Sequence, residues 1–136
     1  MLEAADRLEM LDLVAKYSYG YDTLDWELMG AVWTDDATLV TRGGERRSRA
    51  EIVKGFRARR EGLRDQGIQT RHYQTNTLLE ETGPGTAGGR TLLFVAWQHD
   101  GEPQPTPMHT GEYHDEFRQV DGQWRISRRE ILIDHD

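Results

Sequence analysis

Two residues far apart in the sequence have the types needed for proton transfer. Asp22 ends a segment of helical periodicity, and His72 lies in the strand-like stretch TRHYQTNTLLEE, residues 70–81. A carboxylate that accepts one imidazole N–H orients the ring and stabilises its protonated form, which leaves the other nitrogen as a general base. Each residue also has an ordinary alternative, because Asp22 could cap the next helix and a buried histidine is often purely structural.

The stretch around His72 has an unusual pattern for a strand. Alternate residues place His72, Gln74 and Asn76 on one face, whereas a half-buried strand normally separates apolar from polar side chains. This face therefore either contacts water or lines a cavity that uses hydrogen-bonding groups.

The elements that must position these residues follow from the periodicity. Residues 3–22 predict a helix whose buried face is formed by Leu8, Leu11, Ala15 and Tyr19. Asp22 continues that face by one turn, so we expect it to point toward the interior. An ionised carboxylate there needs a hydrogen-bonding partner, and His72 is the partner that we predict.

The remaining elements predict one α+β domain over residues 1–136. A short helix is expected at 24–33, a strand at 36–41 and a turn at RGGE, before a third helix with a capping box at Ser48 and Glu51. Strands are expected at 68–81, 90–100, 108–120 and 123–134, the last two joined by a tight turn at Asp121–Gly122. Helices followed by long antiparallel strands indicate one curved sheet packed against a helical layer.

Composition narrows the classes of partner and site. The net charge of −7 argues against nucleic acid as the main partner. Nine of the 17 basic residues fall between Arg42 and Arg64, which indicates either a solvated helix face or a local attraction for an acidic substrate. Without cysteine, and without His-x-His or Glu-x-x-His spacing, we expect no metal site.

The same reasoning predicts where the protein resides. The first residues, MLEAADRLEMLD, lack the basic and then apolar layout of a signal peptide. The longest apolar run, residues 92–97, is too short to cross a bilayer. We expect a soluble cytoplasmic protein without a membrane role.

Three stretches resemble the SnoaL-like group of the nuclear-transport-factor-2-like superfamily, which includes polyketide cyclases, scytalone dehydratase and hexachlorocyclohexane dehydrochlorinase. They are KYSYGYDTLDWELMGAVWTDDATL, RHYQTN and GEYHDEFRQVDGQWRIS, and the resemblance covers nearly the whole chain in order. It implies a cone-shaped α+β barrel, with N-terminal helices packed on a strongly curved antiparallel or mixed sheet around a deep pocket.

The resemblance also implies roles for individual residues. In scytalone dehydratase and the dehydrochlorinase, an aspartate that ends the first helix holds a histidine that removes a substrate proton. Asp22 and His72 match these positions. Tyr21 matches a substrate-binding tyrosine of scytalone dehydratase. The arginine of the dehydrochlorinase, near the end of its third long strand, has no clear counterpart, and Arg118 lies only close to that place.

With this resemblance, we interpret the polar face around His72 as a cavity wall, where Gln74 binds substrate and Asn76 supports the backbone of a helix. Asp115 and Arg128 are expected to form a structural ion pair between strands. The other expected substrate-binding residues are Tyr17, Tyr21, Trp26, Trp33, Trp97, His99, His109 and Tyr113.

The leading hypothesis for function is a cofactor-independent lyase, cyclase or isomerase, similar to a dehydratase, that acts on a small hydrophobic substrate such as a polyketide or an aromatic compound. The alternative is a non-catalytic ligand-binding or assembly subunit, as in the small subunit of aromatic-ring dioxygenases. The pair of Asp22 and His72 favours the enzyme, because an assembly subunit needs neither. Apolar residues of both parities in TLLFVAW and EILI predict that a second copy covers the outer face of the sheet, in a homodimer or larger assembly.

Overall fold

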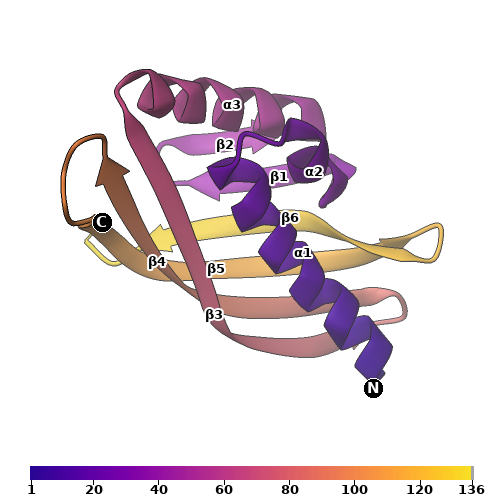
Figure 1. Ribbon diagram of the computed structural model, residues 1–136. Coiled ribbons are helices and arrows are strands. Elements are labelled where there is room, and N and C mark those ends of the chain that lie inside the picture. Colours follow the sequence, from indigo (N-terminus) through magenta and orange to yellow (C-terminus); the bar gives the residue numbers. More distant parts are fainter. Residues whose placement is uncertain (136) are drawn as a thin grey trace.

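The computed structural model describes residues 1–135 as three helices and one mixed sheet of six strands (Figure 1). The elements are α1 (Ala4–Asp22), α2 (Trp26–Ala31), β1 (Trp33–Thr41), β2 (Gly44–Arg47), α3 (Arg49–Asp65), β3 (Ile68–Gly83), β4 (Thr86–His99), β5 (Thr106–Val120) and β6 (Gln123–Ile133). No helix in this part of the chain is long and apolar enough to cross a membrane.

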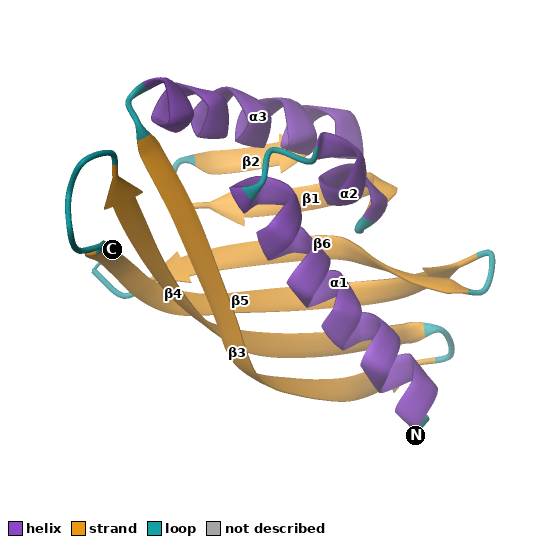
Figure 2. Cartoon of the chain, in the orientation of Figure 1, coloured by secondary structure: helices purple, strands orange, loops and turns teal. Residues whose placement is uncertain are grey.

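The sheet has the order β2-β1-β6-β5-β4-β3, and its neighbouring strands are antiparallel except for the parallel pair of β1 and β6. It curves strongly, and α1 and α3 lie against the same side of it (Figure 2). The helix α3 contacts β1 and β2 at one end of the sheet and β3 at the other. The predicted α+β cone is therefore confirmed, but the sheet stays open and is not closed into a barrel.

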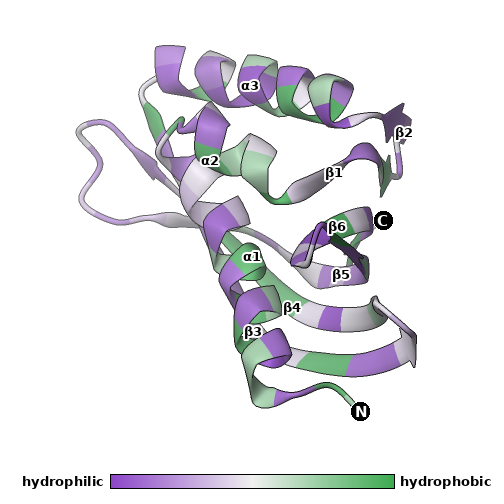
Figure 3. Ribbon diagram, turned by 90° about the vertical axis from the view of Figure 1, so that its right-hand side faces the viewer, coloured by the Kyte–Doolittle hydropathy of each residue, from purple (hydrophilic) through white to green (hydrophobic). Residues whose placement is uncertain are grey.

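The core lies between the helices and the sheet. Apolar side chains of α3, including Ile52 and Phe56, are buried on its inner side, while its outer side is hydrophilic (Figure 3). Only half of the predicted capping box of α3 is present: the Ser48 hydroxyl accepts a hydrogen bond from the backbone N–H of Glu51 at 3.2 Å, but the backbone N–H of Ser48 donates to the carbonyl oxygen of Ala37 at 2.8 Å and not to Glu51. Asp25, rather than Asp22, caps α2 by accepting from the backbone N–H of Leu28 at 3.0 Å.

The buried face of α1 differs from the prediction. Leu8 and Tyr19 are both 67% exposed, and Leu11 is 40% exposed. The helix is apolar on two sides, and the side that packs on the sheet carries Met10, Leu13, Val14 and Tyr17. Asp22 is nevertheless buried, because α3 and β3 pack over the last turn of the helix.

Two further local features were not predicted. Gly44–Arg47 forms the edge strand β2 and pairs with β1 in place of the longer turn that was expected. All four of its residues are exposed, so it has no apolar alternation by which to recognise it. A bulge in β3 between Thr75 and Leu78 places the exposed Asn76 at φ 56°. Asn76 therefore leaves the row of His72 and Gln74 and supports no helix.

Candidate active site

Asp22 and His72 form a hydrogen-bonded pair where the end of α1 meets β3. The Oδ1 atom of Asp22 lies 2.8 Å from Nδ1 of His72, and its Oδ2 accepts the backbone N–H of His72 at 2.8 Å. The Thr70 hydroxyl donates to Oδ1 at 2.7 Å. Because a carboxylate accepts, Nδ1 of the neutral ring carries the hydrogen and Nε2 is the nitrogen left to accept a proton.

The backbone beside this pair is tied to α3 and β3. The carbonyl oxygen of Asp22 accepts from Nη2 of Arg60 at 3.2 Å and from Nε2 of Gln69 at 2.9 Å. The buried Arg60 also donates to the carbonyl of Ile68 at 3.0 Å, and burial lowers its pKa from the ordinary value. The last turn of α1 is thus held to both elements that bring His72 into place.

His72 contributes to the wall of a cavity of about 290 Å³ between the helices and the sheet. Aromatic and aliphatic side chains dominate this wall, and its cationic side chains are arginines of β2 and α3. The lining consists of Tyr17, Tyr21, Thr41, Arg46, Phe56, Arg59, His72, Leu93, Val95, His109, Tyr113, Ile131 and Ile133.

Tyr21 is the aromatic neighbour of the histidine. Its ring packs edge to face on His72, with 4.9 Å between the ring centroids. Burial raises the pKa of Tyr21 to about 12, so its hydroxyl keeps its hydrogen at neutral pH. The ring of Trp26 also packs on Tyr21, with 6.4 Å between the ring centroids, but Trp26 is not among the residues that line the cavity.

A buried arginine lies beneath the inner tyrosines of the cavity. The guanidinium carbon of Arg129 is 4.3 Å from the ring centroid of Tyr17 and 4.0 Å from that of Tyr113. Arg129 also forms two hydrogen bonds with Asp115, at 2.7 and 2.8 Å. Burial is the largest single influence and lowers the pKa of Arg129, but the charge and hydrogen bonds of Asp115, together with the two tyrosines, leave the pKa above its usual range.

This pair corrects the predicted partner of Asp115, which is Arg129 and not Arg128. A bulge between Glu116 and Phe117 shifts the register of β5 and β6, so that Asp115 lies opposite Arg129. The guanidinium of Arg128 instead forms an ion pair with Glu130, with 3.8 Å between Nη2 and Oε2.

Gln74 joins the buried arginine to α1. Its amide nitrogen donates to the carbonyl of Val14 at 3.0 Å and to the Ser18 hydroxyl, and its oxygen accepts from Arg129 at 3.1 Å. Because its polar atoms are engaged with the protein, Gln74 supports the cavity wall rather than lining it.

The structure divides the predicted binding residues into two groups. Tyr17, Tyr21, His109 and Tyr113 line the cavity with His72. The others lie outside the lining: Trp33 is fully buried and packs on Tyr17, and the half-buried Trp97 lies beside His99 at 6.2 Å.

Sequence reasoning missed several lining residues, notably Phe56, Arg46 and Arg59. The only signal for the two arginines was the basic run over residues 42–64.

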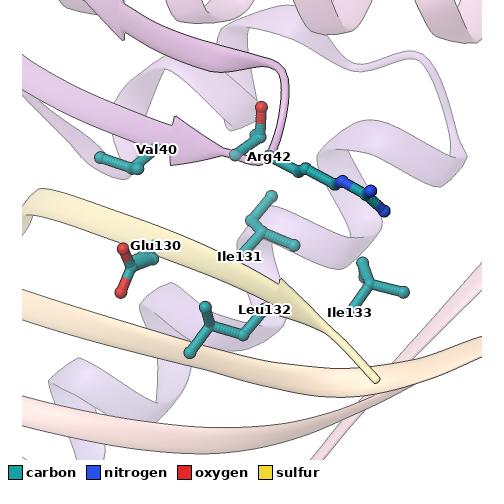
Figure 4. Close-up of a pocket in the computed structure, with 7 residues that line it drawn as sticks. Val40, Arg42, Glu130, Ile131, Leu132 and Ile133 are labelled. Carbon is teal, nitrogen blue, oxygen red and sulfur yellow. The ribbon is translucent and has the colours of Figure 1, made fainter. Parts of the chain in front are cut away.

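A second cavity of about 370 Å³ adjoins the first, between the ends of β1 and β6 (Figure 4). Val40–Arg42 and Glu130–Ile133 line it, and three of these residues, Thr41, Ile131 and Ile133, also line the first cavity. Since β1 pairs with β6 only as far as Val40 and Glu130, the gap beyond this point opens beside the candidate site.

Comparison with known proteins supports the family assignment. Residues 2–130 match the family described as SnoaL-like domain. A search of curated protein sequences finds no match.

Solved structures of similar fold include ActVI-ORFA from Streptomyces coelicolor, with 21% identity, a TM-score of 0.88 and coverage of 98% of both chains. A putative scytalone dehydratase from Novosphingobium aromaticivorans has 22% identity and a TM-score of 0.79, with coverage of 95% of this chain and 84% of that one. A hexachlorocyclohexane dehydrochlorinase, LinA type 2, has 21% identity and a TM-score of 0.80, with coverage of 96% and 86%. The matched residues and the shared fold show that this chain belongs to the SnoaL-like domain family.

Proposed function

We propose that this protein is a cofactor-independent lyase, cyclase or isomerase in which His72 is the general base. The observation that carries the proposal is the 2.8 Å contact of Asp22 Oδ1 with His72 Nδ1, in a ring that also lines the cavity. The free Nε2 would remove a proton next to a carbonyl or phenol of a hydrophobic substrate. Asp22 orients the ring and stabilises the imidazolium that forms.

The cavity offers further groups for such a reaction. Abstraction of a proton next to a carbonyl places negative charge on oxygen, and hydroxyl donors that face the cavity stabilise it. Tyr21, whose pKa is raised to about 12 by burial, carries such a hydroxyl on the ring that packs against His72, and Phe56 and Leu93 supply apolar wall for a ring system. The names of the similar dehydratase and dehydrochlorinase structures denote lyases, which agrees with this chemistry.

Deuterium exchange tests the proposal without knowledge of the natural substrate. We expect the wild-type protein to catalyse exchange next to the carbonyl or hydroxyl carbon in a panel of cyclic ketones and phenols in D₂O, including β-tetralone, followed by proton NMR. His72→Ala and Asp22→Asn should each reduce the rate by about 10²- to 10⁴-fold, the contribution of a positioned general base.

His99→Ala is the matched control, because His99 lies outside the cavity lining, and it should retain the rate. Circular dichroism and thermal melts verify that each variant is folded. Losses below about tenfold in both dyad variants would refute the assignment. Binding of panel members to the wild type without any exchange would instead indicate a non-catalytic ligand-binding role.

A further inference from the structure

Two guanidinium groups at the candidate site lack a carboxylate partner within residues 1–135. Arg46 of β2 and Arg59 of α3 both line the cavity, and no ion pair joins either one to an Asp or Glu of this range. Their neighbours in sequence are paired: Arg47 with Glu45 at 3.0 Å, Arg57 with Glu61 at 2.8 Å and Arg64 with Asp65 at 3.2 Å.

The cavity lining is cationic although the chain carries a net charge of −7. Its 13 residues include two arginines but no Asp or Glu. Asp22, the nearest carboxylate to the dyad ring, is engaged with His72 and Thr70. A negatively charged ligand would therefore meet unpaired positive charge in this cavity.

Aromatic rings and a glycine adjoin the two cations, whose side chains also reach the surface. The guanidinium carbon of Arg46 is 5.9 Å from the ring centroid of Phe56, and that of Arg59 is 5.8 Å from the ring of Trp97, within the range of cation–π attraction. Gly55, inside α3, lies directly under the guanidinium of Arg46, and a methyl group at this position would overlap it. The missing side chain at Gly55 provides the space that Arg46 occupies.

We infer that the substrate carries an anionic group, a carboxylate or a phosphate monoester, on a flat hydrophobic body, and that Arg46 and Arg59 bind this group. The planar guanidinium matches both anions with paired hydrogen bonds. The hydrophobic body then lies along Phe56 and the strand residues of the cavity, with its reacting carbon toward His72. This inference rests on the proposed function for the reacting end only, because anion binding is measured without turnover.

Matched ligands test it by isothermal titration calorimetry with the full chain. Naphthoate, naphthyl phosphate and the uncharged naphthamide share one ring system. We expect the wild type to bind one of the two anions at least about tenfold more tightly than naphthamide, as charge-assisted hydrogen bonds require. Whether naphthoate or naphthyl phosphate binds more tightly distinguishes the two anions.

Three variants locate the anion site. The double variant Arg46→Gln/Arg59→Gln should lose the preference for the anion and keep its affinity for naphthamide. Gly55→Ala, which leaves the charge unchanged but displaces Arg46, should weaken the preference. Arg57→Gln/Arg64→Gln removes the same charge from α3 outside the lining and should retain the preference in full.

Several results would overturn the inference: no detectable anion binding, equal binding of naphthamide and the anions, or an unchanged preference in the double variant. The proposed function is judged separately with Asp22→Asn. That variant should lose deuterium exchange and keep the anion preference, so that failure of the dyad and failure of the anion site give different results.

Discussion

At the scale of single residues, the two carboxylate oxygens of Asp22 contact the backbone and the ring of the same histidine. One oxygen accepts the backbone N–H of His72 and the other lies at the ring nitrogen of the same residue. Because both contacts go to one residue of β3, the ring cannot turn away without losing alignment with the carboxylate. The Thr70 hydroxyl, at 2.7 Å, adds a third donor to this buried carboxylate, which would be costly to bury without hydrogen bonds.

The raised pKa of the buried Tyr21 predicts how the free energy of unfolding depends on pH in the alkaline range. Burial raises the pKa of Tyr21 from 10 to about 12, so the unfolded chain loses this proton at a lower pH than the folded one. The free energy of unfolding is therefore not reduced by ionisation of Tyr21 below pH 10, and it falls as the pH rises from 10 toward about 12. The full difference corresponds to about 3 kcal/mol.

Urea unfolding at a series of alkaline pH values measures this effect. Tyr21→Phe should make the fall in unfolding free energy above pH 10 shallower than in the wild type. Tyr19→Phe, at a side chain that is 67% exposed, is the control and should leave the slope unchanged. Identical slopes for the wild type and Tyr21→Phe would contradict the raised pKa of Tyr21 in the folded protein.

At the scale of elements, the contact between α1 and α2 depends on one glycine. A Cβ atom at Gly20 would lie 2.9 Å from the backbone nitrogen of Met29 and 3.0 Å from its Cα. Since these are backbone atoms, the helices would have to separate. Gly20→Ala should therefore lower the free energy of unfolding by about 1–3 kcal/mol, the usual cost of overpacking.

Gly62→Ala is the matched comparison, because Gly62 lies within α3 and nothing approaches its Cβ position within 4 Å. This change should raise the stability by about 0.5–1 kcal/mol, as alanine favours helix. Chemical denaturation measures both variants. Equal effects of the two substitutions would show that helix propensity, rather than the contact with Met29, decides the outcome.

The strand register shows why some contacts could not be predicted. Counting back along both strands from the turn at Asp121–Gly122 places Asp115 opposite Arg128, but the bulge inserts one residue in β6 and brings Arg129 there. A shift of one residue also exchanges the two faces of a strand. The sequence thus predicted the strands and their turn, whereas the buried partner of Asp115 depended on a bulge that no residue pattern announces.

Helix faces were ambiguous for a different reason. Periodicity located α1 correctly, but apolar residues occur on two of its sides, and only the sheet decides that Met10 and Tyr17 are buried while Leu8 and Tyr19 are exposed. Asp22 was predicted to be buried on the evidence of the wrong face. Its contact with His72 agrees with the resemblance to the SnoaL-like group and with the need of a buried carboxylate for donors.

At the scale of the whole molecule, the cavity combines residues from all parts of the chain. Periodicity and family resemblance could predict an α+β fold with a curved sheet, and with it the approach of α1 to β3. They could not predict that Arg46 and Arg59 lie at one cavity, because that depends on how α3 packs against the edge of the sheet that β2 forms. The cationic character of the site is therefore a property of the tertiary structure.

The outer face of the sheet leads to the last prediction, which concerns assembly. Tyr73 and Phe94 lie opposite each other on β3 and β4, are 54% and 40% exposed, and have ring centroids 6.2 Å apart. Leu92, two residues before Phe94 on β4, extends this apolar area at 46% exposure, and Leu132, 41% exposed, lies on β6 beyond Glu112. An exposed group of large apolar side chains on a sheet marks an interaction surface, and we expect a second copy of the chain to cover it.

Light scattering coupled to gel filtration tests this at micromolar concentration. The wild type should have the mass of a dimer or larger closed assembly, and Tyr73→Glu/Phe94→Glu should have that of a monomer, because two carboxylates in an apolar interface stay unpaired. Leu8→Glu/Tyr19→Glu is the matched control: it adds the same charge on α1, where both side chains are 67% exposed, and should leave the mass unchanged. A monomeric wild type would refute the expectation, and the exposed rings of Tyr73 and Phe94 would then face solvent.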